Sequence, residues 1–355
     1  MVNKVRKLNK RQEMILENFE QGKEYASSEI VEFFTTETEI PSQTTLGRDI
    51  SELVSLGFLE QKGKLKGTTY LLTILGMVNA PIDAHRYCSI ETDQRNAKTQ
   101  YNLSLFNEFP NKIFTKEEIE GLDVKTKLFT DKSQNASSTI QKKELERFVI
   151  ELSWKSSKIE GNTYTILDTE LLLKEGTEAK GHTKDEAIMI LNHKKAFQYI
   201  LSVREKWQKP NVRQIEDVHR LLVEELNVSF GLRTRSVGIT GSKYLPLAIP
   251  TQIHEALNDL CIAIDRIKNP YEKALLALVG ISYIQPFEDG NKRTARLFAN
   301  AILLAYGCAP LSYRNVDEKN YRESILVFYE KNSIVPMRKI FTEQYFFACE
   351  NYLKF

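Results

Sequence analysis

The chain has 355 residues, of which 42% are hydrophobic and 27% charged, and its formal net charge at pH 7 is +2. This length predicts two domains with sizeable cores, and the near-neutral charge does not by itself favour a nucleic-acid or membrane partner. We expect no membrane span and no secretion, because no run of about 18 apolar residues and no leader pattern occur. The four cysteines are widely spaced (Cys88, Cys261, Cys308, Cys349), which favours reduced thiols in a cytoplasmic protein.

Residues 1–78 have the pattern of three helices followed by a β-hairpin. Apolar side chains recur at helical spacing in three stretches (10–19, 26–34 and 41–59). Two short β-prone runs then flank the sequence KGKLKG. This order of elements resembles the winged helix-turn-helix family over about 70 residues.

The resemblance to winged helices implies DNA binding. On the third helix the candidates for base or phosphate contacts are Gln43, Thr44, Thr45 and Arg48, and at the hairpin tip they are Lys62, Lys64 and Lys66. Residues 1–75 contain ten Lys and Arg against eleven Asp and Glu, a net charge of −1, which is a weak electrostatic footprint for DNA. The alternative is a winged helix used for protein contacts or for a homodimer.

The rest of the chain is predicted to be mainly α-helical. Residues 79–135 carry Pro, Asn and Asp punctuation with short periodic pieces, typical of a connector that packs on a second domain. Residues 136–355 show one helical pattern after another, which predicts an orthogonal helical bundle. A β-hairpin is expected at 234–250, where Val, Ile and Gly-Ser interrupt the helical pattern.

The stretch IQPFEDGNKRTAR, residues 284–296, predicts a phosphate-binding loop at a helix start. Gly290 lets the backbone approach an anion, and the first N–H groups of the following helix point toward it. Arg293 and Arg296 are three residues apart and share one side of that helix. Asp289 is placed where one carboxylate could hold Mg²⁺ between phosphates. The pattern indicates a nucleotide polyphosphate site; the alternative is an ordinary solvated helix N-terminus.

Three motifs resemble the Fic/Doc (Fido) family. QPFEDGNKRTAR, 285–296, matches His-Pro-Phe-x-(Asp/Glu)-Gly-Asn-(Gly/Lys)-Arg-x-x-Arg at every defined position except the first. SSKIEGNTYT, 156–165, resembles the inhibitory motif (Ser/Thr)-x-x-x-Glu-(Gly/Asn), with Ser156, Glu160 and Gly161 in register. GLRTRSVGITGSKYLP, 231–246, resembles the segment leading into the flap. Together these motifs assign residues 136–355 to a Fic-like domain.

The resemblance implies transfer of AMP from ATP to a hydroxyl side chain of a target protein, or of the protein itself, with Mg²⁺. Asp289 would bind the metal, and the anion hole would consist of Gly290, Asn291 and Lys292. Arg293 would contact the phosphates and Arg296 the γ-phosphate, and Glu160 would pair with Arg296 and bar that phosphate. The target polypeptide would be held by the flap residues (Ile239, Thr240, Gly241, Ser242, Lys243, Tyr244).

The chain departs from the family pattern at two positions. Gln285 replaces the histidine that acts as general base, and an amide has no titratable proton near neutrality. Lys292 occurs where many members have Gly, and the Doc branch also has Lys there. His219 is interpreted as a core or supporting histidine of a helix.

Three functions therefore remain open. One is an autoinhibited adenylyltransferase with weak or lost chemistry at Gln285. Another is a non-catalytic, nucleotide-sensing transcriptional regulator that binds DNA through the winged helix. The third is a Doc-like phosphotransferase that donates the γ-phosphate of ATP to a protein. All three bind ATP.

Overall fold

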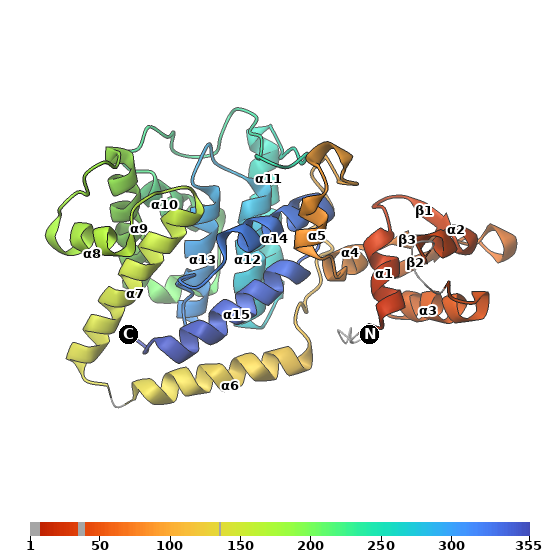
Figure 1. Cartoon of the computed structure of the whole chain (residues 1–355), viewed down its shortest axis with the longest axis horizontal. Coiled ribbons are helices and arrows are strands. Elements are labelled where there is room, and N and C mark those ends of the chain that lie inside the picture. The colour runs from red at the N-terminus through yellow and green to blue at the C-terminus, as the bar shows by residue number, and fades with distance from the viewer. Residues whose placement is uncertain (1–7, 35–39, 135) are drawn as a thin grey trace. The chain divides into compact units, whose positions relative to one another are not determined.

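The computed structural model describes residues 8–34, 40–134 and 136–355, apart from the side chain of Lys66. The chain divides into two compact units (Figure 1). Unit 1 comprises Met1–Thr115, Gly238–Leu245 and Arg322–Met337, and unit 2 comprises Lys116–Val237, Pro246–Tyr321 and Arg338–Phe355. This division differs from the boundaries expected at residues 78 and 135, because unit 1 extends to Thr115 and also takes up two segments from the second half of the chain.

The N-terminal part of unit 1 contains three helices and a small antiparallel sheet. The helices are α1 (Lys10–Asn18), α2 (Ser27–Val31) and α3 (Gln43–Ser55). The predicted hairpin is formed by β2 (Leu59–Lys62) and β3 (Thr69–Leu72), which pair antiparallel, and β1 (Glu24–Ala26) joins the free edge of β3. The three predicted helices and the hairpin are therefore present, and the strand β1 is an addition that its three residues did not signal.

Capping and burial explain why these helices form where they do. Asn9 and Gln12 make a capping box at the start of α1. Ser42 accepts a hydrogen bond from the N–H of Thr45 at the start of α3. The apolar faces of both helices are buried, as Ile15 and Ile50 show with exposures of 0% and 1%. Unit 1 continues through α4 (Ile74–Asn79), α5 (Ala84–Ser89) and most of α14 (Glu318–Lys331).

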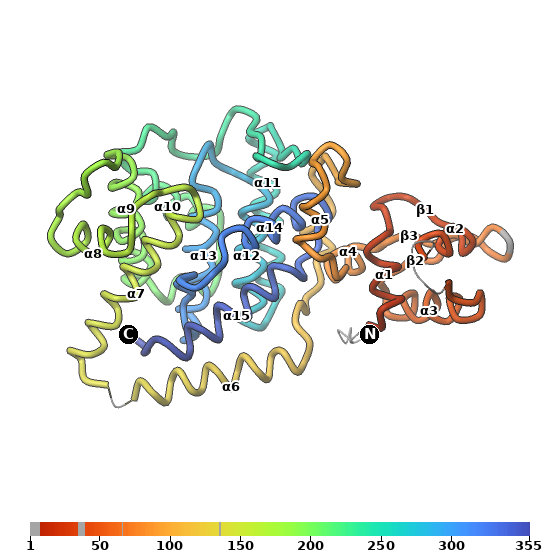
Figure 2. The backbone as a smooth tube through the Cα atoms, viewed as in Figure 1, coloured from red at the N-terminus to blue at the C-terminus, as the bar shows by residue number. Residues whose placement is uncertain are grey.

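Unit 2 is a helical bundle, which confirms the predicted mainly α-helical fold. Its elements run in chain order as α6 (Lys116–Ser133), α7 (Ser138–Ile159), α8 (Ile166–Glu175), α9 (Lys184–Ser202), α10 (Val212–Leu222), α11 (Pro250–Arg266), α12 (Pro270–Ile284), α13 (Asn291–Ala305) and most of α15 (Val335–Asn351). At the centre α12 packs along α13, and every residue of α12 from Tyr271 to Ile284 is buried. Figure 2 lets the chain be followed from α12 through a short loop into α13.

The long helix α6 was not predicted, because it lies inside the stretch 79–135 that was interpreted as a connector. The helix has 18 residues, yet only Leu122, Phe129 and Ser133 are buried, while Val124 and Leu128 are exposed. Its apolar residues are thus divided between two faces, which blurs the helical period. The helix is held instead by polar contacts to α15, among them Lys132 Nζ to the carbonyl of Cys349 at 2.6 Å.

The β-hairpin expected at 234–250 is a wrong prediction. This fully described segment contains no strand; it has one isolated bridge, between Gln100 and Leu245, and a turn in which the N–H of Ser242 bonds to the carbonyl of Ile239. A β-ladder within this segment is disfavoured because the carbonyl of Gly241 and the hydroxyl of Ser242 bond to Arg95 and Glu330 instead. The prolines at 246 and 250 also have no backbone N–H to donate to a neighbouring strand. The turn is an anchored loop rather than a hairpin.

The four cysteines form no disulfide, and three of them are buried. Within the described ranges no helix is both long enough and apolar enough to cross a membrane.

Candidate nucleotide-binding site

The loop between α12 and α13 begins at Gln285, which caps α12 in the left-handed region with φ of 50°. Its side-chain Nε2 donates to the carbonyl of Ser282 at 2.6 Å, so the amide folds back onto the last turn of α12. Its own carbonyl accepts from Arg233 Nε at 2.7 Å, and the N–H of Arg233 donates to the carbonyl of Pro286 at 3.0 Å. Arg233 is 1% exposed, so this buried guanidinium fixes the start of the loop.

Phe287 and His219 support the middle of the loop. Their rings are stacked with centroids 3.7 Å apart and 7° between planes, and both side chains are fully buried. His219 Nε2 donates to the carbonyl of Asp289 at 3.0 Å, and burial lowers the pKa of the imidazole to about 4. His219 is therefore a neutral, Nε2-protonated support of the loop at neutral pH.

Asn291 closes the loop onto the start of α13. Its side chain accepts from the N–H of Phe287 and donates to the carbonyl of Phe287, both at 2.8 Å. Gly290 is the N-cap of α13 with φ of +80° and gives no side-chain cap. A Cβ at this position would lie 3.3 Å from Val223 Cγ1 and 3.4 Å from the His219 ring. The first N–H groups of α13 therefore lack a capping side chain, which suits an anion.

Arg293 lies beneath this helix start and is 1% exposed. One of its nitrogens, Nη2, pairs with Asp289 at 2.7 Å. Its Nε and Nη1 are buried and have no hydrogen-bond partner among the described residues. Two buried guanidinium nitrogens without an acceptor are unfavourable, so Nε and Nη1 are candidates for contact with a bound anion.

Arg296, one turn further along α13, is fully buried and fully engaged by α7. Its Nε donates to Ser156 Oγ, its Nη2 to the carbonyl of Ser156, and its Nη1 to Glu160 Oε1, each at 2.8 Å. The guanidinium also lies 5.7 Å from the ring centre of Tyr321. The pair predicted between Glu160 and Arg296 is thus present in the geometry of the structure.

Glu160 is held between two cations. Besides Arg296, Lys292 Nζ lies 3.5 Å from its second carboxylate oxygen. Burial works against ionisation of Glu160, but the charges of Arg296 and Lys292 outweigh it and lower the pKa of the carboxyl. Glu160 is therefore ionised at neutral pH and pairs with two cations of the predicted phosphate site.

A metal ion at this site would have one protein carboxylate, that of Asp289, which is 64% exposed. Among the described residues no group of three or more His, Cys, Asp or Glu side chains could hold a metal. One carboxylate fits Mg²⁺, which is commonly bound by one or two carboxylates together with substrate phosphates.

The residues of the predicted nucleotide site and those of the predicted flap belong to different units of the chain. The predicted phosphate loop, Arg293, Arg296 and the residues of the predicted inhibitory motif (Ser156, Glu160, Gly161) all belong to unit 2. The predicted flap, 239–244, belongs to unit 1, where Glu330 accepts from Ser242 Oγ at 2.6 Å and Arg95 Nη2 donates to the carbonyl of Gly241 at 2.8 Å. Arg95 and Glu330 are buried and pair with each other at 3.2 Å.

The predicted DNA-contacting residues lie in unit 1. Gln43, Thr44 and Arg48 are exposed on α3, whereas Thr45 is half-buried and its hydroxyl lies 2.9 Å from Ser42 Oγ. On the hairpin Lys62 and Lys64 are exposed. The side chain of Lys66 lies outside the described part of the structure.

Two supporting residues were missed by the sequence reading. Arg233 lies within the segment 231–246 that resembles the approach to the flap, but nothing in that segment predicts its bonds to the loop. His193 on α9 is completely buried; burial, with smaller contributions from Arg296 and Arg293, lowers its pKa. Neither of its nitrogens has a partner within the described ranges. Only tertiary packing brings these residues to the site.

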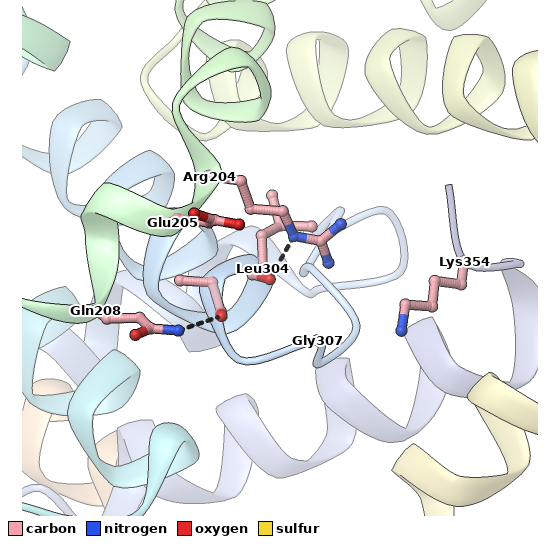
Figure 3. A pocket seen from close by; sticks show the side chains of 7 residues that line it. Arg204, Glu205, Gln208, Leu304, Gly307 and Lys354 are labelled. Atoms are coloured by element: carbon pink, nitrogen blue, oxygen red, sulfur yellow. Dashed lines mark hydrogen bonds between the residues drawn. The ribbon is translucent and has the colours of Figure 1, made fainter.

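A separate pocket of about 370 Å³ lies at the other end of α13 (Figure 3). Here Arg204 Nε donates to the carbonyl of Leu304 at 2.6 Å and Gln208 Nε2 to that of Ala305 at 3.2 Å, so both side chains cap the end of the helix. A helix of 15 residues is about 22 Å long, so this pocket is remote from the phosphate loop.

The sequence around this site is similar to that of known proteins. Residues 209–303, which contain the loop and both arginines, match a family model described as Fic/DOC family. A Fic/DOC family domain is thus found at residues 209–303. A relative from Nematostella vectensis, named protein adenylyltransferase Fic, is 31% identical over 218 residues, which cover 60% of this chain and 50% of the relative. The chain spans about half the length of the curated relatives it matches.

Solved structures share the fold of this Fic domain. A Fic domain containing signalling protein from Bacteroides thetaiotaomicron aligns with a TM-score of 0.54 and 24% identity, covering 66% of this chain and 94% of the other. Fic-1 from C. elegans aligns with a TM-score of 0.56 and 18% identity, covering 67% and 70%. At these identities the likeness concerns the fold alone.

Proposed function

We propose that the Fic domain binds ATP with Mg²⁺ at the start of α13, that Glu160 restrains this binding, and that transfer of AMP to a protein hydroxyl is weak or lost at Gln285. The observation that carries the proposal is Arg293, a buried guanidinium with two unpartnered nitrogens under an uncapped helix N-terminus. A phosphate supplies the acceptors that these donors lack.

The other residues of the loop complete a polyphosphate site. The backbone N–H groups of Asn291 and Lys292 begin α13 without a capping side chain and would be donors for a phosphate, and Lys292 adds a charge. Asp289 would share Mg²⁺ with phosphate oxygens, and the ion when bound would neutralise phosphate charge. Each of these groups binds or orients the nucleotide.

Glu160 opposes binding by direct competition. Its carboxylate occupies Nη1 of Arg296, the nitrogen that would meet the γ-phosphate. A carboxylate and a phosphate use the same donor geometry on an arginine, so only one of them is accommodated. The site in this arrangement favours a diphosphate over a triphosphate.

Neither Gln285 nor His219 supplies a base for the transfer step. The hydroxyl oxygen of the target would attack the α-phosphorus, pyrophosphate would leave, and the hydroxyl proton would need an acceptor. Gln285 offers an amide that already donates to Ser282, and His219 donates its Nε2 proton to the loop and has a pKa of about 4. Loss of a positioned general base slows such a step by about 10²–10⁴-fold.

Calorimetric titration of ATP with Mg²⁺ tests the binding proposal. The Glu160→Gly protein is compared with Glu160→Gly carrying Arg293→Met, and thermal unfolding without nucleotide checks that both are folded. We expect Arg293→Met to weaken ATP binding by about 10–100-fold, because bonds to a charged phosphate are lost. Equal affinity in the two folded proteins would remove the basis of the proposal.

A second candidate is a nucleotide-sensing DNA-binding regulator without catalysis. It is favoured by the absence of a base at Gln285 together with the exposed polar positions Gln43, Thr44 and Arg48 on α3. Retention of the protein on duplex DNA at moderate salt should be lost on Arg48→Ala with Lys64→Ala. Retention unchanged by the two substitutions would count against this function.

A further inference from the structure

The segment that follows the inhibitory Glu160 is fastened to the first turn of α9. The N–H and Oγ1 of Thr163 donate to Glu186 Oε1 at 2.7 and 2.6 Å. The N–H and Oγ1 of Thr183 donate to the other oxygen, Oε2, at 2.9 and 3.1 Å. One carboxylate thus serves two purposes, since Oε2 caps its own helix and Oε1 holds a different segment of the chain. We call the bonds between Thr163 and Glu186 the clasp.

Two neighbouring contacts reinforce the clasp. Asn162 Nδ2 donates to the carbonyl of Glu186 at 2.9 Å. His182 Nδ1 lies 2.8 Å from Thr163 Oγ1. A hydroxyl has one proton, and Thr163 gives it to the carboxylate, so His182 must be the donor of this second bond. Burial opposes ionisation of Glu186, but hydrogen bonds from Thr163 and Thr183 prevail and lower the pKa of its carboxyl to about 2.

The clasp lies close to the inhibitory contact along the chain. Only Gly161 and Asn162 lie between Glu160 and Thr163, so the two residues are at most about 11 Å apart along the chain. Glu160 is the C-cap of α7, and Gly161 follows with φ of +100°, outside the helix. Figure 1 shows α7, α8 and α9 next to one another in unit 2, and α7 packs on both of the others. Because Thr163 is hydrogen-bonded to Glu186 on α9, it limits how far Glu160 can move away from Arg296.

The bonds to Oε1 are not needed for the helix cap of α9. The capping box of Thr183 and Glu186 is complete with Oε2 alone. Thr163 and Thr183 are both exposed threonines that donate to the same carboxylate, so they form a matched pair in which only one member lies beside the inhibitory residue.

We propose that Thr163 and Glu186 are positioning residues that hold Glu160 on Arg296 and so set the preference of the site for a nucleoside diphosphate over a triphosphate. This inference rests on the proposed function, and it deepens it by naming what holds the restraint in place. The clasp acts through Glu160 alone and touches no nucleotide.

The experiment measures ATP and ADP affinities, with Mg²⁺, by calorimetry for the full chain and its Thr163→Val and Thr183→Val variants. We expect Thr163→Val to tighten ATP binding by about 2- to 5-fold with ADP unchanged, because one bond to a charged group is lost. Thr183→Val should leave the ratio of ATP to ADP affinity as it is in the parent. Thr163→Ser, which keeps the hydroxyl, should behave as the parent.

A double variant shows whether the effect passes through Glu160. In the Glu160→Gly background, Thr163→Val should change neither affinity. A change that persists there, or equal changes in the two Thr→Val variants, would overturn the inference. If Glu160→Gly binds ATP as the parent does, the proposed restraint and this inference both fail. If Glu160→Gly binds ATP more tightly and Thr163→Val does not, this inference alone fails.

Discussion

Two regions of unit 2 meet the first turn of α13, and they treat its arginines differently. The loop from Gln285 to Gly290 leaves Arg293 with two buried nitrogens unpartnered among the described residues. The end of α7 instead engages all three nitrogens of Arg296, through Ser156 and Glu160. One region leaves donors for the proposed anion, and the other pairs its arginine with an internal carboxylate.

The different surroundings of the two arginines suggest that nucleotide binding, its restraint and AMP transfer depend on different residues. In the proposed function, binding rests on the loop and Arg293, restraint rests on Glu160, and transfer rests on the residue at position 285. Each property can be altered by a substitution in its own region, and the predictions below are arranged to test that independence.

The largest expected effect is on transfer. With ATP labelled on the α-phosphate, we expect Gln285→His in the Glu160→Gly background to raise incorporation of label into protein by about 10²–10⁴-fold over Glu160→Gly alone. The matched control is Gln285→Asn, which should stay at the lower level. Label appearing only from γ-labelled ATP would indicate phosphotransfer instead, and no label at all would contradict the adenylyltransferase chemistry.

A smaller effect concerns the support of the loop. The pKa of His219 is lowered to about 4 in the folded state, against about 6.5 when unfolded. As pH falls, the imidazole is therefore protonated in the unfolded chain before it is protonated in the folded one. The free energy of unfolding consequently decreases as pH falls from about 6.5 toward 4.

Between pH 7 and 5 this linkage amounts to about 2 kcal/mol in the free energy of unfolding. Denaturant unfolding at both pH values measures it. In His219→Phe, which keeps an aromatic ring against Phe287, the decrease between the two pH values should shrink by about that amount. An identical decrease in both proteins would contradict a neutral, buried His219.

The smallest expected effect is the pH dependence of the restraint. The pKa of Glu160 is lowered, so its ion pair is present above the usual carboxyl pKa of about 4.3 and is lost only as pH falls through the lower folded value. The ratio of ATP affinities between Glu160→Gly and the parent protein should therefore be flat from pH 6 to 8. A ratio that declines within this range would show that another group titrates at the contact.

Much of this site could be predicted from the sequence because it is local. The turn at Gly290 and the two arginines three residues apart lie within one loop and one helix start, and the partner of Arg296 was implied by a second motif. The family resemblance, rather than spacing, supplied that partner.

What could not be predicted depends on tertiary packing. Arg233 reaches the carbonyl of Gln285 across 52 positions of sequence, and the stack of His219 on Phe287 spans 68 positions. The hairpin expected at 234–250 failed for a related reason, since its turn bonds to the distant residues Arg95 and Glu330 rather than to itself. The pattern of residues in a short segment cannot predict hydrogen bonds to residues that are distant in the sequence.

The most direct test of the account compares ATP with ADP in the parent protein and in Glu160→Gly, by calorimetric titration with Mg²⁺. We predict that Glu160→Gly tightens ATP binding by about 10-fold or more and leaves ADP binding nearly unchanged, because Arg296 is released only for a third phosphate. An equal gain for both nucleotides, or no gain for ATP, would contradict the claim that Glu160 occupies the place of the γ-phosphate.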